Sequence, residues 1–231
     1  RFEKDAPIRG GIPIIFPWFG KPEGKTSQHG FARVRPWELV EIAKQADGSV
    51  IAHFSLPVSA ELLAIPLDYY VTVSKTLTAE LVVRNYSDRE FVFENCLHTY
   101  FMVGDIAQVN VHGLQGVDYL DALEGRARRQ EMSGVIRFTG EVDRLYINTP
   151  HAVEIRDASL QRTILVEKEG STSTVVWNPW IAKAKAMADF GDEEYKRMVC
   201  VESCNAAVNE IKLAVGQEAR LKVNLSSQPG Q

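Results

Sequence analysis

The sequence has little cysteine, few helix-forming stretches and no long apolar run. Its three cysteines, Cys96, Cys200 and Cys204, form an odd set at irregular spacing, which excludes a disulfide-stapled scaffold and is typical of a reducing compartment. Cys200 and Cys204 lie four positions apart, whereas common zinc sites leave two residues between paired cysteines. We therefore expect three packing cysteines, no bound metal and a cytoplasmic protein.

Further absences exclude several classes of function. No apolar run of about eighteen residues is present and no signal peptide can be recognised, so we expect no membrane partner. The net charge is −4, without the basic excess that is typical of nucleic-acid binders. Also missing are the glycine-rich nucleotide loop, the His-Glu-x-x-His zinc helix and the Gly-x-Ser-x-Gly nucleophile turn. We expect no cofactor, and an anionic ligand must be held by a few local arginines.

What is present is mostly strand pattern. The 231 residues, 45% of them hydrophobic, suffice for one large domain, and no repeat or linker divides residues 1–231. A short helix is predicted over Ile181–Phe190, a helical turn over Glu61–Ile65, and a frayed tail over Ser226–Gln231. Runs rich in β-branched and aromatic residues predict strands at Tyr69–Thr76, Leu77–Asn85, Phe91–Phe101, Ala107–His112, Val135–Thr139, Val153–Arg156, Thr163–Glu167, Thr174–Trp177, Met198–Glu202, Ala207–Leu213 and Glu218–Leu225. Many short strands favour an all-β sandwich or barrel.

The block Ile8–Arg33 is the most informative stretch, because it sets two arginines among glycines, prolines and aromatics. Glycine lets the backbone approach a ligand closely, and the planar fork of Arg9 or Arg33 matches a phosphate or carboxylate. Gln28 and His29 either line a polar pocket or form a turn. The block is typical of a pocket wall for a small anionic ligand.

A candidate acid lies on the strand pattern Phe91–Tyr100. Alternation places Glu94, Cys96, His98 and Tyr100 on one face, where both ring nitrogens of the histidine can find partners. Histidine has an ordinary pKa near neutrality, which suits proton transfer. The alternative interpretation is a hydrogen-bonded core histidine.

A candidate base ends the apolar run Met198–Glu202. Burial of the Glu202 carboxylate would raise its pKa towards a value useful for a general base, unless the side chain reaches solvent at a strand edge. Asp143 either binds a hydroxyl group or stabilises a turn. Trp177 and Trp180 either stack on a sugar face or belong to the core.

Together these segments resemble the aldose 1-epimerase superfamily, and within it the glucose-6-phosphate 1-epimerase branch, the hexose-6-phosphate mutarotases. They follow the order of the family and spread over nearly the whole chain. The segments that carry the resemblance are Ile8–Gly20, Gln28–Arg33, Asn95–Tyr100, Asp143–Tyr146, Trp177–Trp180 and Asp189–Glu202, followed by Cys204-Asn205-Ala206.

The resemblance implies a large antiparallel β-sandwich, the supersandwich of galactose mutarotases. Family members usually carry several more strands before the Arg-Gly-Gly-Ile-Pro segment, whereas here eight residues precede Arg9, so the first strands of the fold are expected to be missing. By the same resemblance, His98 occupies the position of the catalytic histidine and Glu202 that of the catalytic glutamate. The positions that match substrate-binding residues of the family are Arg9, Gln28, Arg33 and Asp143.

The implied activity is the interconversion of the α and β anomers of a hexose 6-phosphate by ring opening. The expected partner is the phosphosugar alone, and the protein is expected to be a monomer without cofactor or metal. Two alternatives stay open: a neutral-sugar aldose 1-epimerase, and a carbohydrate-binding β-sandwich without catalysis. A glycosidase normally needs two facing carboxylates, whereas this pattern offers one carboxylate and one histidine.

Overall fold

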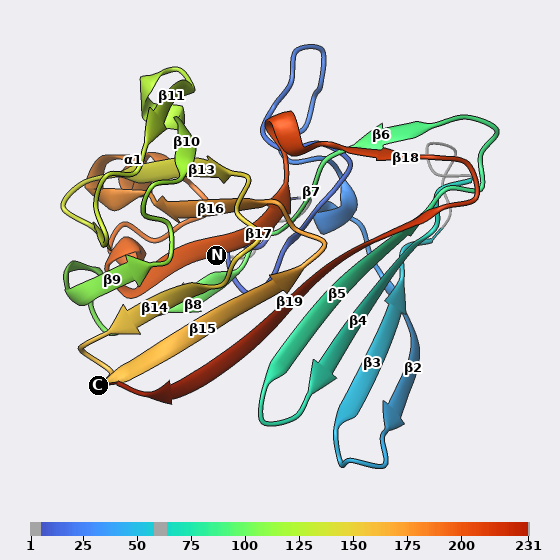
Figure 1. Ribbon diagram of the computed structural model, residues 1–231, viewed down its shortest axis with the longest axis horizontal. Helices are drawn as coiled ribbons and strands as arrows, with labels where there is room; N and C mark the ends of the chain where they lie inside the picture. The colour runs from blue at the N-terminus through green and yellow to red at the C-terminus, as the bar shows by residue number, and fades with distance from the viewer. Residues whose placement is uncertain (1–5, 58–63, 231) are drawn as a thin grey trace.

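The computed structural model describes residues 6–57 and 64–230, and antiparallel strands make up most of its regular structure (Figure 1). Two large sheets pack against each other, which confirms the predicted all-β sandwich. One sheet has the order β1 (Ile14–Ile15), β7 (Asn95–Leu97), β17 (Met198–Asn205), β16 (Ser173–Asn178), β13 (Val142–Ile147), β10 (Asp118–Asp121) and β11 (Ala127–Gln130), with β8 (Tyr100–Met102) also paired to β17.

The other sheet is longer, and its strands β5 to β2 continue beyond the first sheet towards the lower right of Figure 1. Its order is β12 (Ile136–Arg137), β9 (Val109–His112), β14 (Val153–Asp157), β15 (Arg162–Glu169), β19 (Glu218–Pro229), β5 (Leu77–Arg84), β4 (Leu67–Val73), β3 (Val50–Ser55) and β2 (Glu38–Lys44). A two-stranded sheet pairs β6 (Phe91–Phe93) with β18 (Ile211–Leu213).

Helices are short in the described residues. The α-helix α1 spans Trp180–Ala186, and 3₁₀ turns occur at η1 (Ala32–Val34), η3 (Ile106–Gln108), η4 (Ala122–Glu124), η5 (Glu194–Arg197) and η6 (Ala207–Asn209). None of these helices has the length and apolar character needed to cross a bilayer.

The core lies between the sheets and draws on both of them. Strand β17 is buried along all eight of its residues, because β7 and β8 flank it on one side and β16 on the other. Val199 and Val201 alternate along it with Cys200 and Glu202, so the two pairs lie on opposite faces of the strand. A strand that is buried along its whole length therefore carries the carboxylate that the sequence singled out.

Several local predictions need correction. The expected strand Phe91–Phe101 is divided into β6, β7 and β8, and the tail is not frayed, because β19 pairs with β15 as far as Pro229. Part of the run Ala207–Leu213 is the turn η6, and only Ile211–Leu213 forms a strand, β18. The predicted turn Glu61–Ile65 lies mostly outside the described residues.

The cysteines correct another expectation. Cys200 is a buried free thiol, as predicted, but Cys96 and Cys204 face each other across β7 and β17 and form a disulfide. They are 108 residues apart in sequence, so spacing alone could not reveal that they are neighbours.

Gly30 fixes the path of the polar loop that leads to Arg33. It forms a parallel bridge to Phe16, and its φ of +67° lies in the left-handed region. A Cβ at this position would lie 1.9 Å from the carbonyl oxygen of Phe16, which is too close for any side chain. Glycine is therefore required here for close backbone packing as well as for conformation.

Replacement of Gly30 by alanine tests this packing. We expect Gly30→Ala to destabilise the protein by about 2 kcal/mol or more beyond Gly24→Ala, measured by urea unfolding. Gly24 is the matched control, since its φ is +76° but a Cβ there meets open space. Equal losses in the two variants would contradict a steric role for the contact between Gly30 and Phe16.

Candidate functional site

Strand register gathers the candidate residues on one face of the first sheet. Tyr100, Cys200 and Trp177 are aligned across β8, β17 and β16, and Asp143 on β13 continues the row. Directly paired residues point to the same side of a sheet, as do residues two apart on one strand. Glu202 therefore lies on the same face, one step along β17.

His98 and Glu202 are in direct contact. The Nε2 atom of His98 lies 3.2 Å from Oε1 of Glu202, and their side chains are 7% and 1% exposed. The two groups form an ion-pair contact but not a hydrogen bond, since Oε1 of Glu202 has no hydrogen-bond partner among the described residues. The Nδ1 atom of His98 also lacks one, contrary to the expectation that both ring nitrogens find partners. Imidazole and carboxylate thus face each other with unused hydrogen-bonding capacity.

Aromatic rings fix the orientation of the His98 imidazole. Tyr100 stacks on it with ring centroids 4.9 Å apart and an interplanar angle of 10°. Trp177 and His29 approach edge-on, at 6.0 Å and 5.9 Å between centroids. Three neighbouring rings leave the imidazole little freedom to rotate, which keeps its Nε2 atom directed at Glu202.

The surroundings shift the ionisation of both groups. Burial raises the pKa of Glu202 well above its ordinary value, with a further contribution from Asp143 and an opposing one from Arg33. Burial lowers the pKa of His98, and His29 and Arg33 lower it further. A carboxylate with a raised pKa is a stronger base, and a neutral imidazole can donate its N–H, so the pair suits proton transfer.

Two arginines lie close to this pair. Arg9 Nε is 2.8 Å from Asp189 Oδ2, whereas no described carboxylate pairs with Arg33. The Arg33 NH2 group donates to the carbonyl oxygen of Gln28 at 3.0 Å, and its buried Nε has no partner among the described residues. Burial and the nearby charge of Arg9 lower the pKa of Arg33 to about 10. The two guanidinium groups lie near each other, and the Nε donor of Arg33 is not used by the described residues, so together they form a site for an anion.

Cavities open beside both arginines. One of about 710 Å³ is lined by Arg9, Gly10 and Tyr100, and one of about 220 Å³ by Gly10 and Arg33. Gly10 forms part of both walls, so the two arginines border adjoining spaces. Tyr100 separates the larger cavity from the His98 ring on which it stacks.

The remaining predicted residues lie around these groups. Gln28 contacts His29 through their Nε2 atoms at 3.1 Å, and the Nδ1 atom of His29 accepts a hydrogen bond from the Gly20 amide. Burial lowers the pKa of His29 to about 3, so its ring is neutral. Asp143 Oδ2 lies 3.9 Å from Nζ of Lys183 on α1, with its side chain 29% exposed. Asp143 is thus accessible to a polar ligand.

Two neighbours were not predicted as site residues, Asp189 and Cys200, whereas the pocket interpretation of His29 and the ligand interpretation of Trp177 had been left open. Alternation along Met198–Glu202 could have placed Cys200 on the face of Glu202, just as alternation along Phe91–Tyr100 places Tyr100 on the face of His98. The contact of Asp189 with Arg9 spans 180 residues of sequence, and no local pattern predicts it.

Metal ligation is a separate question for this cluster. Donor atoms of His98, Cys200 and Glu202 lie within 4.8 Å of one another, as do those of Cys96, Cys204 and Glu202. However, burial raises the pKa of the Cys200 thiol well above its ordinary value, and the disulfide uses both other sulfurs. A cysteine binds a metal as the thiolate, so these donor sets fit a metal poorly.

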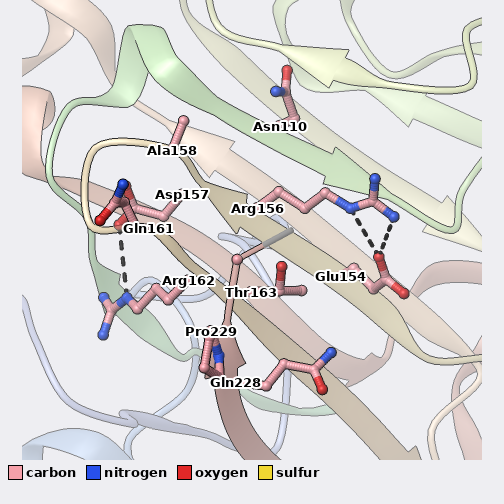
Figure 2. Close-up of a pocket in the computed structure, with 11 residues that line it drawn as sticks. Asn110, Glu154, Arg156, Asp157, Ala158, Gln161, Arg162, Thr163, Gln228 and Pro229 are labelled. Carbon is pink, nitrogen blue, oxygen red and sulfur yellow. Dashed lines mark hydrogen bonds and ion pairs between the residues drawn. The ribbon is translucent and has the colours of Figure 1, made fainter.

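A second hollow, of about 520 Å³, lies on the other sheet (Figure 2). Its arginines have acidic partners: Arg156 lies 2.8 Å from Glu154, and Arg162 lies 3.7 Å from Asp157. Because each guanidinium is balanced by a carboxylate, this hollow lacks the uncompensated positive charge of the Arg33 site.

Comparison with known proteins identifies the family of this chain. The model of the aldose 1-epimerase family matches residues 2–226. The chain belongs to this family. A relative from Cenchrus ciliaris, named "Putative glucose-6-phosphate 1-epimerase", is 39% identical over 99% of this chain and 73% of its own length. A relative of the same name from Escherichia coli K12 is 36% identical over 89% and 70%.

Solved structures share the fold of this chain. The crystal structure of a protein from Salmonella typhimurium, described as a "putative mutarotase", superposes on this chain with a TM-score of 0.89 at 33% identity. The match covers 99% of this chain and 77% of the other. A galactose mutarotase-related enzyme from Lactobacillus acidophilus, at 15% identity and a TM-score of 0.71, shows the fold alone.

The ionisation of Glu202 leads to a prediction about stability. Because folding raises the pKa of Glu202, its contribution to stability is present at low pH and is lost as pH rises through that raised pKa. We expect Glu202→Gln to be more stable than the wild type by about 1–2 kcal/mol at pH 8, and the gain to shrink at pH 5. Urea unfolding at the two pH values measures both effects.

Glu94→Gln is the matched control for this measurement. The two carboxylate oxygens of Glu94 accept hydrogen bonds from the backbone amides of Phe19 and Ala207, each at 2.7 Å. Its replacement should therefore destabilise the protein at pH 8. A Glu202→Gln variant that loses as much stability as Glu94→Gln would contradict our view of Glu202 as a buried charge without adequate partners.

Proposed function

We propose that this protein interconverts the α and β anomers of a hexose 6-phosphate. The observation that carries the proposal is the buried contact between His98 and Glu202 beside the two guanidinium groups of Arg9 and Arg33. Membership of the aldose 1-epimerase family and the names of its relatives support the same reaction.

The short distance between His98 and Glu202 suits this chemistry. In a cyclic hexose, the anomeric hydroxyl oxygen and the ring oxygen are bonded to the same carbon, C1. An acid and a base that serve these two oxygens must therefore be neighbours. Nε2 of His98 and Oε1 of Glu202 are 3.2 Å apart, which meets this requirement. The carboxylate pairs of glycosidases are about 5 Å or more apart, to serve opposite faces of a sugar.

The reaction proceeds in three steps. Glu202 takes the proton of the anomeric hydroxyl while His98 donates a proton to the ring oxygen, and the bond between C1 and the ring oxygen breaks. The open-chain aldehyde rotates about its C1–C2 bond. Closure on the other face of the carbonyl returns both protons, with acid and base exchanging roles. Well-placed general acids and bases each contribute about 10²–10⁴-fold in rate.

The other predicted residues bind the substrate. Arg9 and Arg33 hold the phosphate, which relieves the repulsion between them and uses the free Nε of Arg33. Asp143 accepts a hydrogen bond from a sugar hydroxyl, and Gln28 lines the polar wall. Binding of the phosphate, remote from C1, orients the sugar and adds nothing to the chemical step itself.

The monomeric state and the cytoplasmic location remain predictions from the sequence.

Loss of the base should abolish catalysis but not binding. We expect Glu202→Gln to lower kcat by at least about 10²-fold, measured by NMR exchange between the anomers of glucose 6-phosphate above the spontaneous rate. Binding of the sugar phosphate, measured by calorimetry, should change little. Near-normal exchange in this variant would refute the role of Glu202. Binding without any acceleration by the wild type would instead favour a carbohydrate-binding protein.

Loss of an arginine should reveal the substrate class. Arg33→Ala should raise KM for glucose 6-phosphate by about 10–100-fold, because a charged hydrogen-bonded contact is lost, and should leave the weak activity on glucose unchanged. Arg156→Ala, which removes an equal charge from the other sheet, is the control and should change neither. Equal efficiency of the wild type on glucose and glucose 6-phosphate would favour a neutral-sugar epimerase.

A further inference from the structure

Cys96 has two alternative partners at the centre of the site. It is aligned with Cys204 across β7 and β17, with 4.0 Å between their Cα atoms, and forms a disulfide with it. The same Sγ atom of Cys96 lies 3.2 Å from Oε2 of Glu202, within hydrogen-bonding distance of a thiol. The sulfur has a proton to donate to the carboxylate only when the disulfide is reduced.

We propose that reversible oxidation of Cys96 and Cys204 regulates this enzyme by switching the hydrogen bonding of Glu202. In the dithiol form, the Cys96 S–H donates to the carboxylate. In the disulfide form, this donor is absent and sulfur lone pairs face the carboxylate instead. This inference rests on the proposed role of Glu202 as the base.

The thiol matters because Glu202 has few other partners. Its Oε1 atom has no hydrogen-bond partner among the described residues, and in the dithiol form Cys96 is the donor to Oε2. The titratable groups around the carboxylate are His98 from the turn after β7, Tyr100 from β8, Asp143 from β13, Arg33 from η1, and Cys200 on its own strand. Arg33 favours the charged carboxylate, whereas Asp143 and burial oppose it. Removal of one hydrogen bond therefore moves the balance towards the protonated acid.

Burial restricts the oxidant to a small molecule. Cys96 and Cys204 have no exposed surface, so we name hydrogen peroxide as the co-reactant. Glu202 accepts the proton of Cys96, and the resulting thiolate attacks one peroxide oxygen, so that an S–O bond forms, the O–O bond breaks and water leaves with that proton. The sulfur of Cys204 then attacks Cys96, the S–O bond breaks, and a second water leaves with the proton of Cys204. Two thiols and one peroxide thus give one disulfide and two waters.

Oxidation should shift the acid limb of the pH–activity profile upward. A neutral hydrogen bond to the carboxylate corresponds to about half to one pH unit. At a pH below the limb, activity should therefore fall about three- to tenfold on oxidation and return on reduction. Well above the limb, the two forms should have similar rates.

The experiment compares the intact protein after treatment with a dithiol reductant and after treatment with hydrogen peroxide. Mass spectrometry of peptides detects a Cys96–Cys204 disulfide by the loss of two hydrogen atoms. The pH profile of anomer exchange is then measured for both forms. Carbon NMR of protein labelled in the glutamate carboxyl group follows the titration of Glu202 directly, with Glu202→Gln used to assign its signal.

Cys204→Ser is the matched control, because it keeps the Cys96 donor and the free thiol of Cys200 but cannot form the disulfide. In this variant peroxide carries Cys96 only as far as a sulfenic acid, which mass spectrometry detects by the gain of one oxygen. Its O–H still donates to Glu202, so we expect the variant to lack the upward shift of the acid limb that the wild type shows after peroxide treatment. Failure of peroxide to join Cys96 to Cys204, or a disulfide that leaves the titration of Glu202 unchanged, overturns the proposal. The proposed function fails separately, if the reduced wild type does not accelerate anomer exchange while the NMR titration still shifts.

Discussion

The structure depends on a carboxylate held where a β-sandwich would normally place an apolar side chain. Glu202 lies on β17, the strand with all eight residues buried, and its side chain is 1% exposed. Burial of a charge without strong partners costs free energy, which the flanking strand pairs and the apolar residues of the other face must offset. That cost is what raises the pKa of Glu202 and makes the group useful as a base. Stability and proton transfer are therefore opposed at this one position.

The two arginines of the site are also charged groups that the fold removes from water, here with positive charge. Arg9 is balanced by Asp189, whereas Arg33 is desolvated beside it and keeps an unused Nε donor. The free protein thus holds an electrostatic imbalance that an anionic ligand would remove. Because the imbalance lies beside the acid and base, a ligand with a phosphate at one end and an anomeric carbon at the other complements both halves.

The sequence predicted the all-β class and many strands of the interior, because buried strands such as β5, β15 and β19 show clear apolar alternation. It missed β2, an edge strand with six of its seven residues exposed, where burial imposes no such pattern. Local patterns also singled out His98 and Glu202, since each interrupts an apolar strand with a titratable group.

Other features of the site depend on contacts that no local pattern encodes. Cys96 and Cys204 were predicted to be packing residues, yet strand register aligns them across 108 residues of sequence. That no carboxylate of the described residues pairs with Arg33 likewise depends on where the fold places them, such as Asp189 beside Arg9. Such contacts arise from the pairing of distant strands, and the side chains they join give no signal of it in the sequence.

A crystal structure of the Glu202→Gln variant with glucose 6-phosphate tests the central claim most directly. Our account predicts the phosphate within hydrogen-bonding distance of Nε of Arg33, and C1 between His98 and residue 202. A phosphate in the hollow of the other sheet, or a sugar bound with C1 directed away from His98, would contradict it.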